Sequence, residues 1–152
     1  ACIRDRVSGI GGMNHFMLPD GAGNGLTGVP ARYGVHAVEL LLNELMKRGA
    51  TRSTLEAKVF GGGQVIAGMN TMNVGQRNTE FVLDYLKTER IPVVSKDVMD
   101  VYPRKVCFLP HCGKAMVKRL SPTNAEALVA QDRAAAQKPV PPASGAGSVD
   151  LF

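Results

Sequence analysis

One segment constrains the fold of this chain more than any other: residues 33–48 have the apolar spacing of an amphipathic helix. Large apolar side chains recur there at positions i, i+3, i+4 and i+7, which places them on one helical face: Val38, Leu41, Leu42 and Leu45. Gly49 follows and is typical of the residue that ends a helix. A helix with one apolar face must pack against another layer of the protein, so a core is expected here.

Strand patterns lie on both sides of this helix. Residues 10–18 are a short apolar run that ends at the turn signal Pro19-Asp20-Gly21. A Gly-rich segment, residues 21–28, follows and is expected to be an exposed loop. Residues 55–60 alternate apolar and polar side chains, as a half-buried strand does, and end at three consecutive glycines.

The chain is then expected to continue with a helix and three strands. The helix begins near Asn73, where Asn73 and Gln76 fit a capping box, and ends near Arg90. One face of it is expected to hold Asn78, Phe81, Val82 and Tyr85. Strands are expected at 91–94, 104–109 and 114–120, the last two joined by a hairpin turn. This order predicts the fold class α/β (α+β), a mixed-sheet sandwich with packed helices.

The composition changes after residue 120. A short Ala-rich helix is expected to run to about residue 135, and residues 138–147, rich in Pro, Ala, Gly and Ser, are expected to be disordered. The last residues, 148–152, place Val, Leu and Phe on a polar tail, which favours a peptide that docks on a protein. We therefore predict a folded domain at 1–120 and a helix-plus-tail segment at 121–152.

Composition and charge argue against several classes of protein. No run approaches the roughly 18 apolar residues of a membrane helix, so the chain is not expected to be membrane-embedded. The net charge of +5 favours acidic partners, but the basic residues are not interleaved with aromatics, so no nucleic-acid partner is expected. The odd set of three cysteines predicts reduced thiols in an intracellular protein.

His15 is the candidate catalytic residue. It stands between Asn14 and Phe16 in the first apolar run, which predicts a buried strand position. On the residues alone, a buried histidine that only satisfies a hydrogen bond is the more frequent case. The functional alternative is a general base, since imidazole titrates near neutral pH, and a base of this kind requires a nucleophile such as a thiol within reach. Cys2 is a possible neighbour on the adjacent strand.

Other polar clusters carry weaker signals. Cys107, His111 and Cys112 offer three metal-ligand types around one hairpin, but they lack a Cys-x-x-Cys pair, so free thiols are favoured over zinc. His36 lies in the first helix and is expected at its rim. The glycines 61–63 lack the Lys-Ser or Lys-Thr of a nucleotide loop, which favours a close approach of the backbone to a neighbouring strand or a substrate.

Seven motifs in order, spread from residue 11 to residue 106, resemble those of the CheD family, the chemoreceptor glutamine deamidases of bacterial chemotaxis. The motifs are GGMNHFMLP (11–19), RYG (32–34), ELLLNEL (39–45), LEAKVFGG (55–62), VGQRN (74–78), TERIP (88–92) and YPRKV (102–106). The resemblance covers residues 1 to about 120. It implies a fold like that of the cytotoxic deamidating toxins, which are cysteine hydrolases, and it implies no cofactor.

The resemblance also implies an activity. Such a protein converts selected glutamine side chains on the cytoplasmic helices of chemoreceptors to glutamate by a Cys-His thioester mechanism. His15 matches the catalytic histidine, which deprotonates the thiol and then protonates departing ammonia. The nucleophilic cysteine of the family lies in a Gly-Ser-Cys turn, four residues ahead of the cysteine that Cys2 matches. The nucleophile is therefore expected just upstream of Ala1, and this 152-residue polypeptide is expected to be inactive while a full-length parent is active.

Two alternatives to an enzyme stay open. The chain could be a chemotaxis adaptor that binds receptors or a regulatory phosphatase without chemistry. Besides the receptor helices, the further partner considered is a chemotaxis phosphatase or methylesterase. It could also be a small metal-binding protein built on Cys107, His111 and Cys112. We rank the deamidase first, the adaptor second and the metal-binding protein third, and for the first two we expect a cytoplasmic location.

Overall fold

The computed structural model describes residues 1–16, 34–63, 74–120 and 149–151. Five strands form one sheet in the order β4-β3-β1-β2-β7, and two more form the separate hairpin β5–β6. The strands are β1 (Cys2–Asp5), β2 (Gly11–Asn14), β3 (Leu55–Gly61), β4 (Val93–Val98), β5 (Arg104–Leu109), β6 (Lys114–Arg119) and β7 (Val149–Leu151). The helices are α1 (Gly34–Lys47) and α2 (Val74–Thr88), and a 3-10 turn spans Arg52–Thr54.

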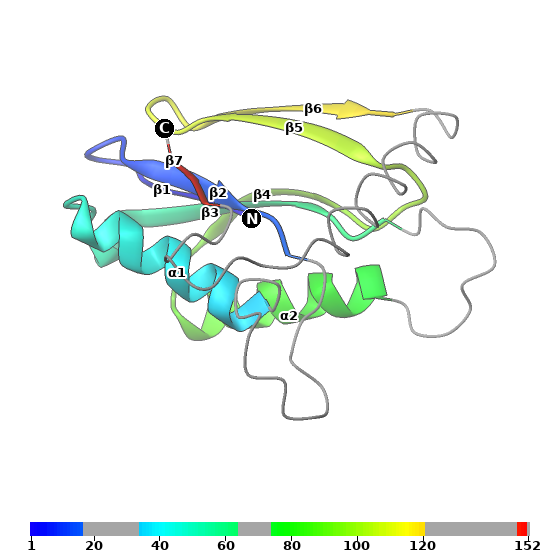
Figure 1. The fold of residues 1–152 in the computed structure, drawn as a ribbon, viewed down its shortest axis with the longest axis horizontal. Coiled ribbons are helices and arrows are strands. Elements are labelled where there is room, and N and C mark those ends of the chain that lie inside the picture. Colours follow the sequence, from blue (N-terminus) through cyan, green and yellow to red (C-terminus); the bar gives the residue numbers. More distant parts are fainter. Residues whose placement is uncertain (17–33, 64–73, 121–148, 152) are drawn as a thin grey trace, which may run out of the picture.

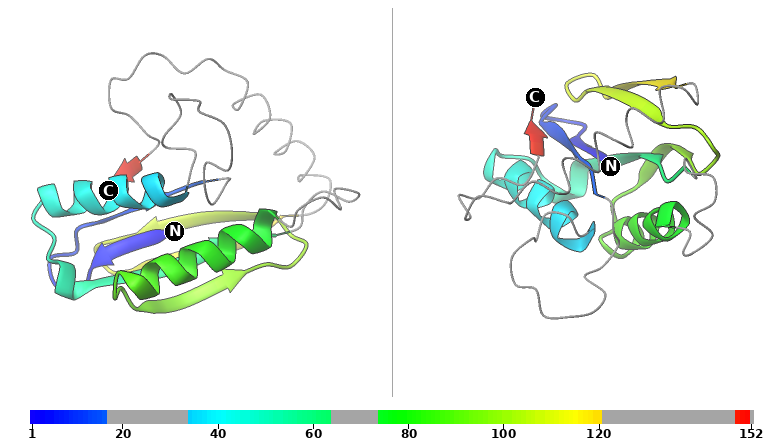
Figure 2. Two further views of the ribbon diagram at one scale, coloured as in Figure 1. Left: turned by 90° about the horizontal axis from the view of Figure 1, so that it is seen from below. Right: turned by 45° about the vertical axis from the view of Figure 1, so that its right-hand side comes forward.

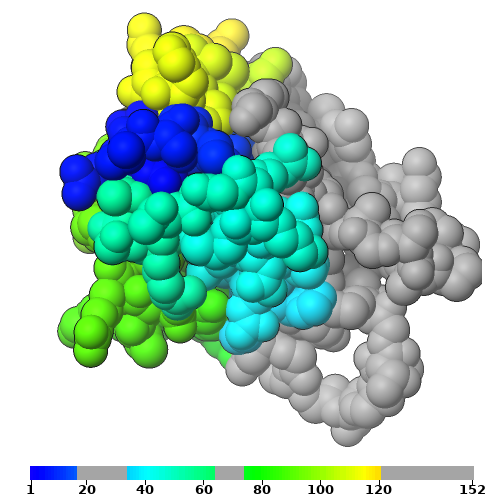
Figure 3. All heavy atoms as spheres, turned by 90° about the vertical axis from the view of Figure 1, so that its left-hand side faces the viewer, coloured from blue at the N-terminus to red at the C-terminus, as the bar shows by residue number. Residues whose placement is uncertain are grey.

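The molecule has three layers. The two helices cover one face of the five-stranded sheet and the β5–β6 hairpin lies over the other face (Figures 1 and 2). Within the sheet, β3 and β4 are parallel while the pairs β1–β2, β1–β3 and β2–β7 are antiparallel. The predicted class, a mixed sheet with packed helices, is confirmed. Figure 3 shows the hairpin stacked directly on the N-terminal strands.

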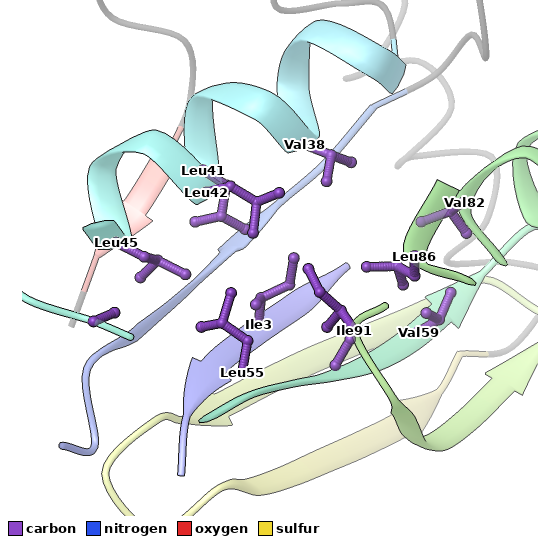
Figure 4. Close-up of a cluster of buried hydrophobic side chains, with 12 residues drawn as sticks. Ile3, Val38, Leu41, Leu42, Leu45, Leu55, Val59, Val82, Leu86 and Ile91 are labelled. Carbon is purple, nitrogen blue, oxygen red and sulfur yellow. The ribbon is translucent and has the colours of Figure 1, made fainter. Parts of the chain in front are cut away.

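The core lies between the sheet and the helices. Helix α1 buries the apolar face predicted from its spacing, and Val38, Leu41 and Leu45 are fully enclosed. They meet Ile3 of β1 and Leu55 of β3 from the sheet side (Figure 4). Burying a large aliphatic side chain contributes roughly 1.5–3 kcal/mol, so this cluster fixes α1 against β1 and β3.

Helix α2 buries a face that includes Val82 of the predicted set but is centred on neighbouring residues. Its buried residues are Thr79, Val82 and Leu86, whereas Phe81 and Tyr85 are half-buried and their rings contact each other at 5.9 Å between centroids. Phe81 and Tyr85, which share the predicted face with Val82, pack against the core from its edge. The sheet instead receives the smaller side chains, because the backbone of α2 approaches β3 closely at Gly62 and Gly75.

Both helices end in the same way. After α1, Gly49 donates to the carbonyl of Met46 and Ala50 donates to that of Leu45, with Gly49 at φ +99°. After α2, Arg90 donates to the carbonyl of Lys87 and Ile91 donates to that of Leu86, with Arg90 at φ 57°. The stop predicted at Gly49 is confirmed, while α2 uses an arginine where glycine is the usual residue.

Two expected strands differ in extent. The strand predicted at residues 10–18 is shorter in the structure: β2 spans Gly11–Asn14, and Asn14 pairs with Ala1, the residue before β1. The strand predicted at 91–94 runs instead from Val93 to Val98, since β3 provides a parallel partner along that length. The hairpin 104–109 with 114–120 is confirmed, and Gly113 adopts φ +69° in its turn.

The end of the chain belongs to the sheet. Val149–Leu151 forms β7 and pairs with β2, with Val149 across from Asn14 and Leu151 across from Gly12. The sequence favours a docking peptide here, and in the structure Val149–Leu151 pairs with the edge strand β2 of its own sheet. The predicted Gly-rich loop, the Asn73 cap and the Ala-rich helix lie outside the described residues, and the boundary at residue 120 stays a prediction.

Candidate active site

His15 lies where two N-terminal strands meet the edge of the described fold. Strand β1 pairs with β2 in an antiparallel register in which Cys2 is opposite Met13 and Ile3 is opposite Gly12. The next pair is Ala1 with Asn14: the Ala1 amino group donates to the Asn14 carbonyl at 2.9 Å, and the Asn14 N–H donates to the Ala1 carbonyl at 2.9 Å. His15 is the residue immediately after this doubly bonded pair.

The His15 side chain is exposed, which corrects the expectation of a buried position. The reason is the length of β2, which ends one residue earlier and leaves the ring beyond the last rung of the ladder. An exposed imidazole next to a fixed strand can be reached by a side chain of another protein. Alternate residues of a strand face the same side, so an extended backbone continued past Asn14 would carry His15 on the side of Met13 and Gly11.

That side of the sheet is the one covered by the hairpin. Arg4, opposite Gly11, donates to the carbonyls of Pro110 and His111 at 3.2 and 3.3 Å and pairs with Glu56 at 2.7 Å. A side chain on Gly11 would collide with Arg4 and Pro110. Gly11 therefore allows the hairpin turn to lie close to β2.

The residues on either side of His15 hold the backbone in place. Asn14 is 6% exposed and faces the helical layer by the alternation of the strand, and within the described residues neither of its side-chain amide atoms has a hydrogen-bond partner. The Phe16 ring packs edge-on against Phe81 of α2, 5.8 Å between centroids, and Gly34 leaves room for Phe81. Sequence reasoning named neither Asn14 nor Phe16 as part of the site, although both flank His15 in the motif.

The thiols of this chain differ in accessibility. Cys2 is 2% exposed, and its burial raises the pKa of its thiol, an effect offset in part by the nearby Ala1 amino group and Lys58. A thiol that stays protonated is a weak nucleophile. Cys2 is therefore a neighbour of the His15 strand, as the sequence suggested, but its environment is that of a core residue.

The structure places the hairpin cysteines on the surface, apart from any cluster of metal-ligating side chains in its described part. Cys107 and Cys112 are exposed, with Cys107 opposite Met116 in the ladder and Cys112 in the turn. Among the residues that the structure describes, no group of three His, Cys, Asp or Glu side chains gathers around a possible ion. The zinc alternative built on Cys107, His111 and Cys112 thus lacks the geometry that it requires.

The structure also shows where His36 and the glycines that follow β3 lie. His36 is half-buried on α1, which fits a rim residue. The glycines that follow β3 do permit a close backbone approach, but to helix α2: a side chain on Gly62 would overlap Thr79 and the carbonyl of Gly75. Gly62 thus approaches a helix, whereas Gly63 approaches the carbonyl of Tyr102 in the segment before β5.

Comparison with known proteins identifies relatives along the whole chain. Residues 17–119 match the family model described as "CheD chemotactic sensory transduction". His15 lies just before this matched range. No helix in the described residues has the length and apolar character needed to cross a membrane.

Three relatives illustrate the similarity. The chain is 58% identical to the "Probable chemoreceptor glutamine deamidase CheD 1" of Albidiferax ferrireducens over 152 residues, all of this chain and 64% of that protein. It is 58% identical over 132 residues to the protein of the same name from Dechloromonas aromatica, 87% of this chain and 66% of that protein. The relative from Thiobacillus denitrificans is 54% identical, with 100% of this chain and 76% of that protein covered. The chain thus spans about two thirds of the length of the first two relatives.

Proposed function

This chain belongs to the CheD family, and on that basis we propose that the protein containing it deamidates glutamine side chains of chemoreceptors, with His15 as the catalytic base and acid. The relatives carry the name chemoreceptor glutamine deamidase, which supplies the reaction and the substrate class. The single observation that carries the role of His15 is the pairing of Ala1 with Asn14, because it fixes what can lie across from the imidazole.

The register supports a nucleophile on the β1 side. Ala1 and Asn14 exchange two hydrogen bonds, so the next pair along an antiparallel ladder is a non-hydrogen-bonded one, in which facing side chains lie closest. A residue joined to the Ala1 nitrogen would occupy that position opposite His15. A residue four positions ahead of Cys2 would share the face of Cys2 and lie diagonally across from His15, within the reach of long side chains.

The proposed reaction runs through a thioester. His15 takes the proton of the thiol, and the sulfur attacks the carbonyl carbon of the glutamine carboxamide. The tetrahedral intermediate collapses as the His15 imidazolium gives its proton to the amide nitrogen, and ammonia leaves. Water, deprotonated by His15, then attacks the thioester and releases glutamate and the thiol. The sum is an amide and water converted to an acid and ammonia.

The exposure of His15 suits a macromolecular substrate. A glutamine on the surface of a helix projects only a short side chain, so the imidazole must lie near the protein surface to meet it. We propose the cytoplasmic helices of chemoreceptors as this substrate, and hence a cytoplasmic location. A chemotaxis phosphatase or methylesterase is proposed as a further partner.

The competing function is a binding module without chemistry. A chemotaxis adaptor would keep the fold and the receptor contacts but would have no use for a thiol beside His15. The two functions differ in whether the gene encodes Gly-Ser-Cys ahead of the Ala1 codon.

The test uses mass spectrometry of a receptor fragment. We would incubate the fragment with this 152-residue chain and with the same chain extended to place a Gly-Ser-Cys cysteine four residues ahead of Cys2. The proposal expects amide-to-acid conversion of specific glutamines by the extended protein only. Conversion by the extended protein that persists after His15→Gln would overturn the role of His15. No conversion by the extended protein, combined with intact receptor binding, would favour the adaptor.

A further inference from the structure

The outer face of the β5–β6 hairpin is an exposed surface that the fold does not use. Phe108 points inward and is 2% exposed. The residues one position before and after it on β5, and those paired with them on β6, point to solvent. The cross-strand pairs on this outer face are Lys105 with Lys118, Cys107 with Met116, and Leu109 with Lys114. Leu109 and Met116 are 44% and 43% exposed and lie diagonally across from each other on the two strands.

The hairpin carries the net charge of the chain. Residues 104–119 contain five basic side chains and no acidic one: Arg104, Lys105, Lys114, Lys118 and Arg119. The whole chain has 18 basic and 13 acidic residues, so 13 of each remain elsewhere and balance. Arg104 and Arg119 both contact Asp97. Within the described part of the chain, the three outer lysines form no ion pair, which leaves a positively charged rim.

Like charges face each other across this surface. Lys105 is directly opposite Lys118, an arrangement that destabilises an antiparallel pair. The fold derives no benefit from it, since the outer face packs against no other described element. A ligand with negative charge would relieve the repulsion, and a ligand with apolar side chains would cover Leu109 and Met116.

We propose that this surface, the outer hairpin face of Lys105, Cys107, Leu109, Lys114, Met116 and Lys118, docks an acidic amphipathic helix of a partner protein. The dimensions match. From Lys105 to Leu109 a strand rises about 14 Å, and a helix covers that length in about nine residues. Acidic side chains separated by that distance would meet the Lys105–Lys118 pair at one end and Lys114 at the other, with apolar residues between them over Leu109 and Met116.

A protein helix is favoured over a polyanion. The outer face has no aromatic side chain for stacking on bases, and its apolar centre lies between the lysines and not beside them. The surface is also separate from the candidate active site, since the opposite face of the same hairpin covers the side of the sheet that holds Cys2 and Met13. The inference therefore goes beyond the proposed function and does not depend on it.

The test combines a designed peptide with charge reversal. The probe is a synthetic helix with leucines at heptad spacing and two glutamates about nine residues apart. The affinity should fall about tenfold or more in Lys105→Glu/Lys118→Glu and should decrease with added salt. Lys87→Glu/Lys96→Glu is the matched control, because both lysines are exposed on other elements, and it should bind like the wild type.

Alkylation of the hairpin thiols locates the peptide. In a Cys112→Ser variant, Cys107 on the outer face should be protected from iodoacetamide by the peptide, whereas Cys112 in a Cys107→Ser variant should react at an unchanged rate. Equal loss of affinity in the control variant, or no protection of Cys107, would overturn the proposal. Equal binding of a lysine-substituted peptide, duplex DNA or phosphatidylserine vesicles at the same face would also overturn it.

Discussion

Ala1 and Asn14 are joined by two backbone hydrogen bonds of 2.9 Å each, and His15 follows directly after this pair. The pair fixes the backbone on one side of His15, and the contact of Phe16 with Phe81 fixes it on the other. The His15 imidazole is exposed, and the backbone that carries it is held on both sides. A catalytic side chain needs rigid support of this kind.

Replacing His15 should lower the rate of deamidation but leave the melting temperature nearly unchanged. In the protein that carries the nucleophile, we expect His15→Gln to slow glutamine deamidation by about 10²- to 10⁴-fold, the usual contribution of general acid–base catalysis. The melting temperature should change little, because the side chain is exposed. The control is His36→Gln on α1, which should leave the deamidation rate unchanged. A large loss of stability in His15→Gln would indicate a structural role instead.

Asp5 should make stability depend on acid pH. This buried carboxylate accepts hydrogen bonds from the backbone N–H groups of Val7 and Thr51, at 2.8 Å each. These bonds, that from Thr51 first, hold the pKa of Asp5 well below its ordinary value. A carboxylate with a lowered pKa stabilises the fold at neutral pH, and this contribution is lost as the pH falls below the unfolded value of about 3.9.

Unfolding of an Asp5→Asn variant checks this dependence. At neutral pH the variant should melt well below the wild type, and the difference should shrink between pH 4 and more acidic conditions, about where the unfolded carboxylate titrates. Asp84→Asn, an exposed position on α2, serves as the control and should melt like the wild type. A difference between Asp5→Asn and wild type that does not vary with pH would contradict the assignment.

Much of this architecture follows from local sequence, and the rest from contacts between distant segments. Helix α1 could be predicted because its apolar spacing is a property of adjacent turns, and the β5–β6 hairpin because two strand patterns flank a turn with Gly113. The hydrogen bond that Asp5 accepts from the Thr51 N–H could not be predicted, since Thr51 lies 46 residues away. The strand β7 could not either, because pairing with β2 depends on which sheet edge is free, and composition alone favoured a tail.

The same distinction applies to the candidate site. His15 was identifiable as a titratable residue in an apolar motif. Its exposure was not, because the apolar motif gives no sign that strand β2 ends at Asn14. The contact of Arg4 with the hairpin turn joins residues 106 positions apart and has no sequence signal. The packing of the hairpin turn over β2 could therefore not be predicted.

Gly113 should be more sensitive to substitution than Gly49. Both have a positive φ, of +69° and +99°, which costs about 1 kcal/mol or more for a residue with a side chain. At Gly113 a methyl group would also collide with the Arg4 guanidinium and displace it from Glu56. We expect Gly113→Ala to lose about 1–3 kcal/mol more than Gly49→Ala, whose nearest neighbour is 4.0 Å away. Equal losses in denaturant unfolding would show that Arg4 does not hold the turn.

Arg90 is a position where substitution should stabilise. It ends α2 at φ 57°, a conformation that glycine adopts without strain, and its side chain is exposed. Arg90→Gly should raise the free energy of unfolding by about 0.5–1 kcal/mol. Arg48→Gly, at the end of α1 with an ordinary φ, should instead lower it. A decrease in both variants would mean that the left-handed conformation of Arg90 is not a source of strain.

The reactivity of the nucleophilic thiol tests the central claim most directly. In the chain extended with a cysteine four residues ahead of Cys2, the rate of alkylation by iodoacetamide would be measured against pH, with and without His15→Gln. A thiol beside His15 should titrate well below the free value of about 8.5 and return toward it in the variant. A thiol that titrates at or above the free value, with the same profile in both proteins, would contradict the pairing of sulfur and imidazole.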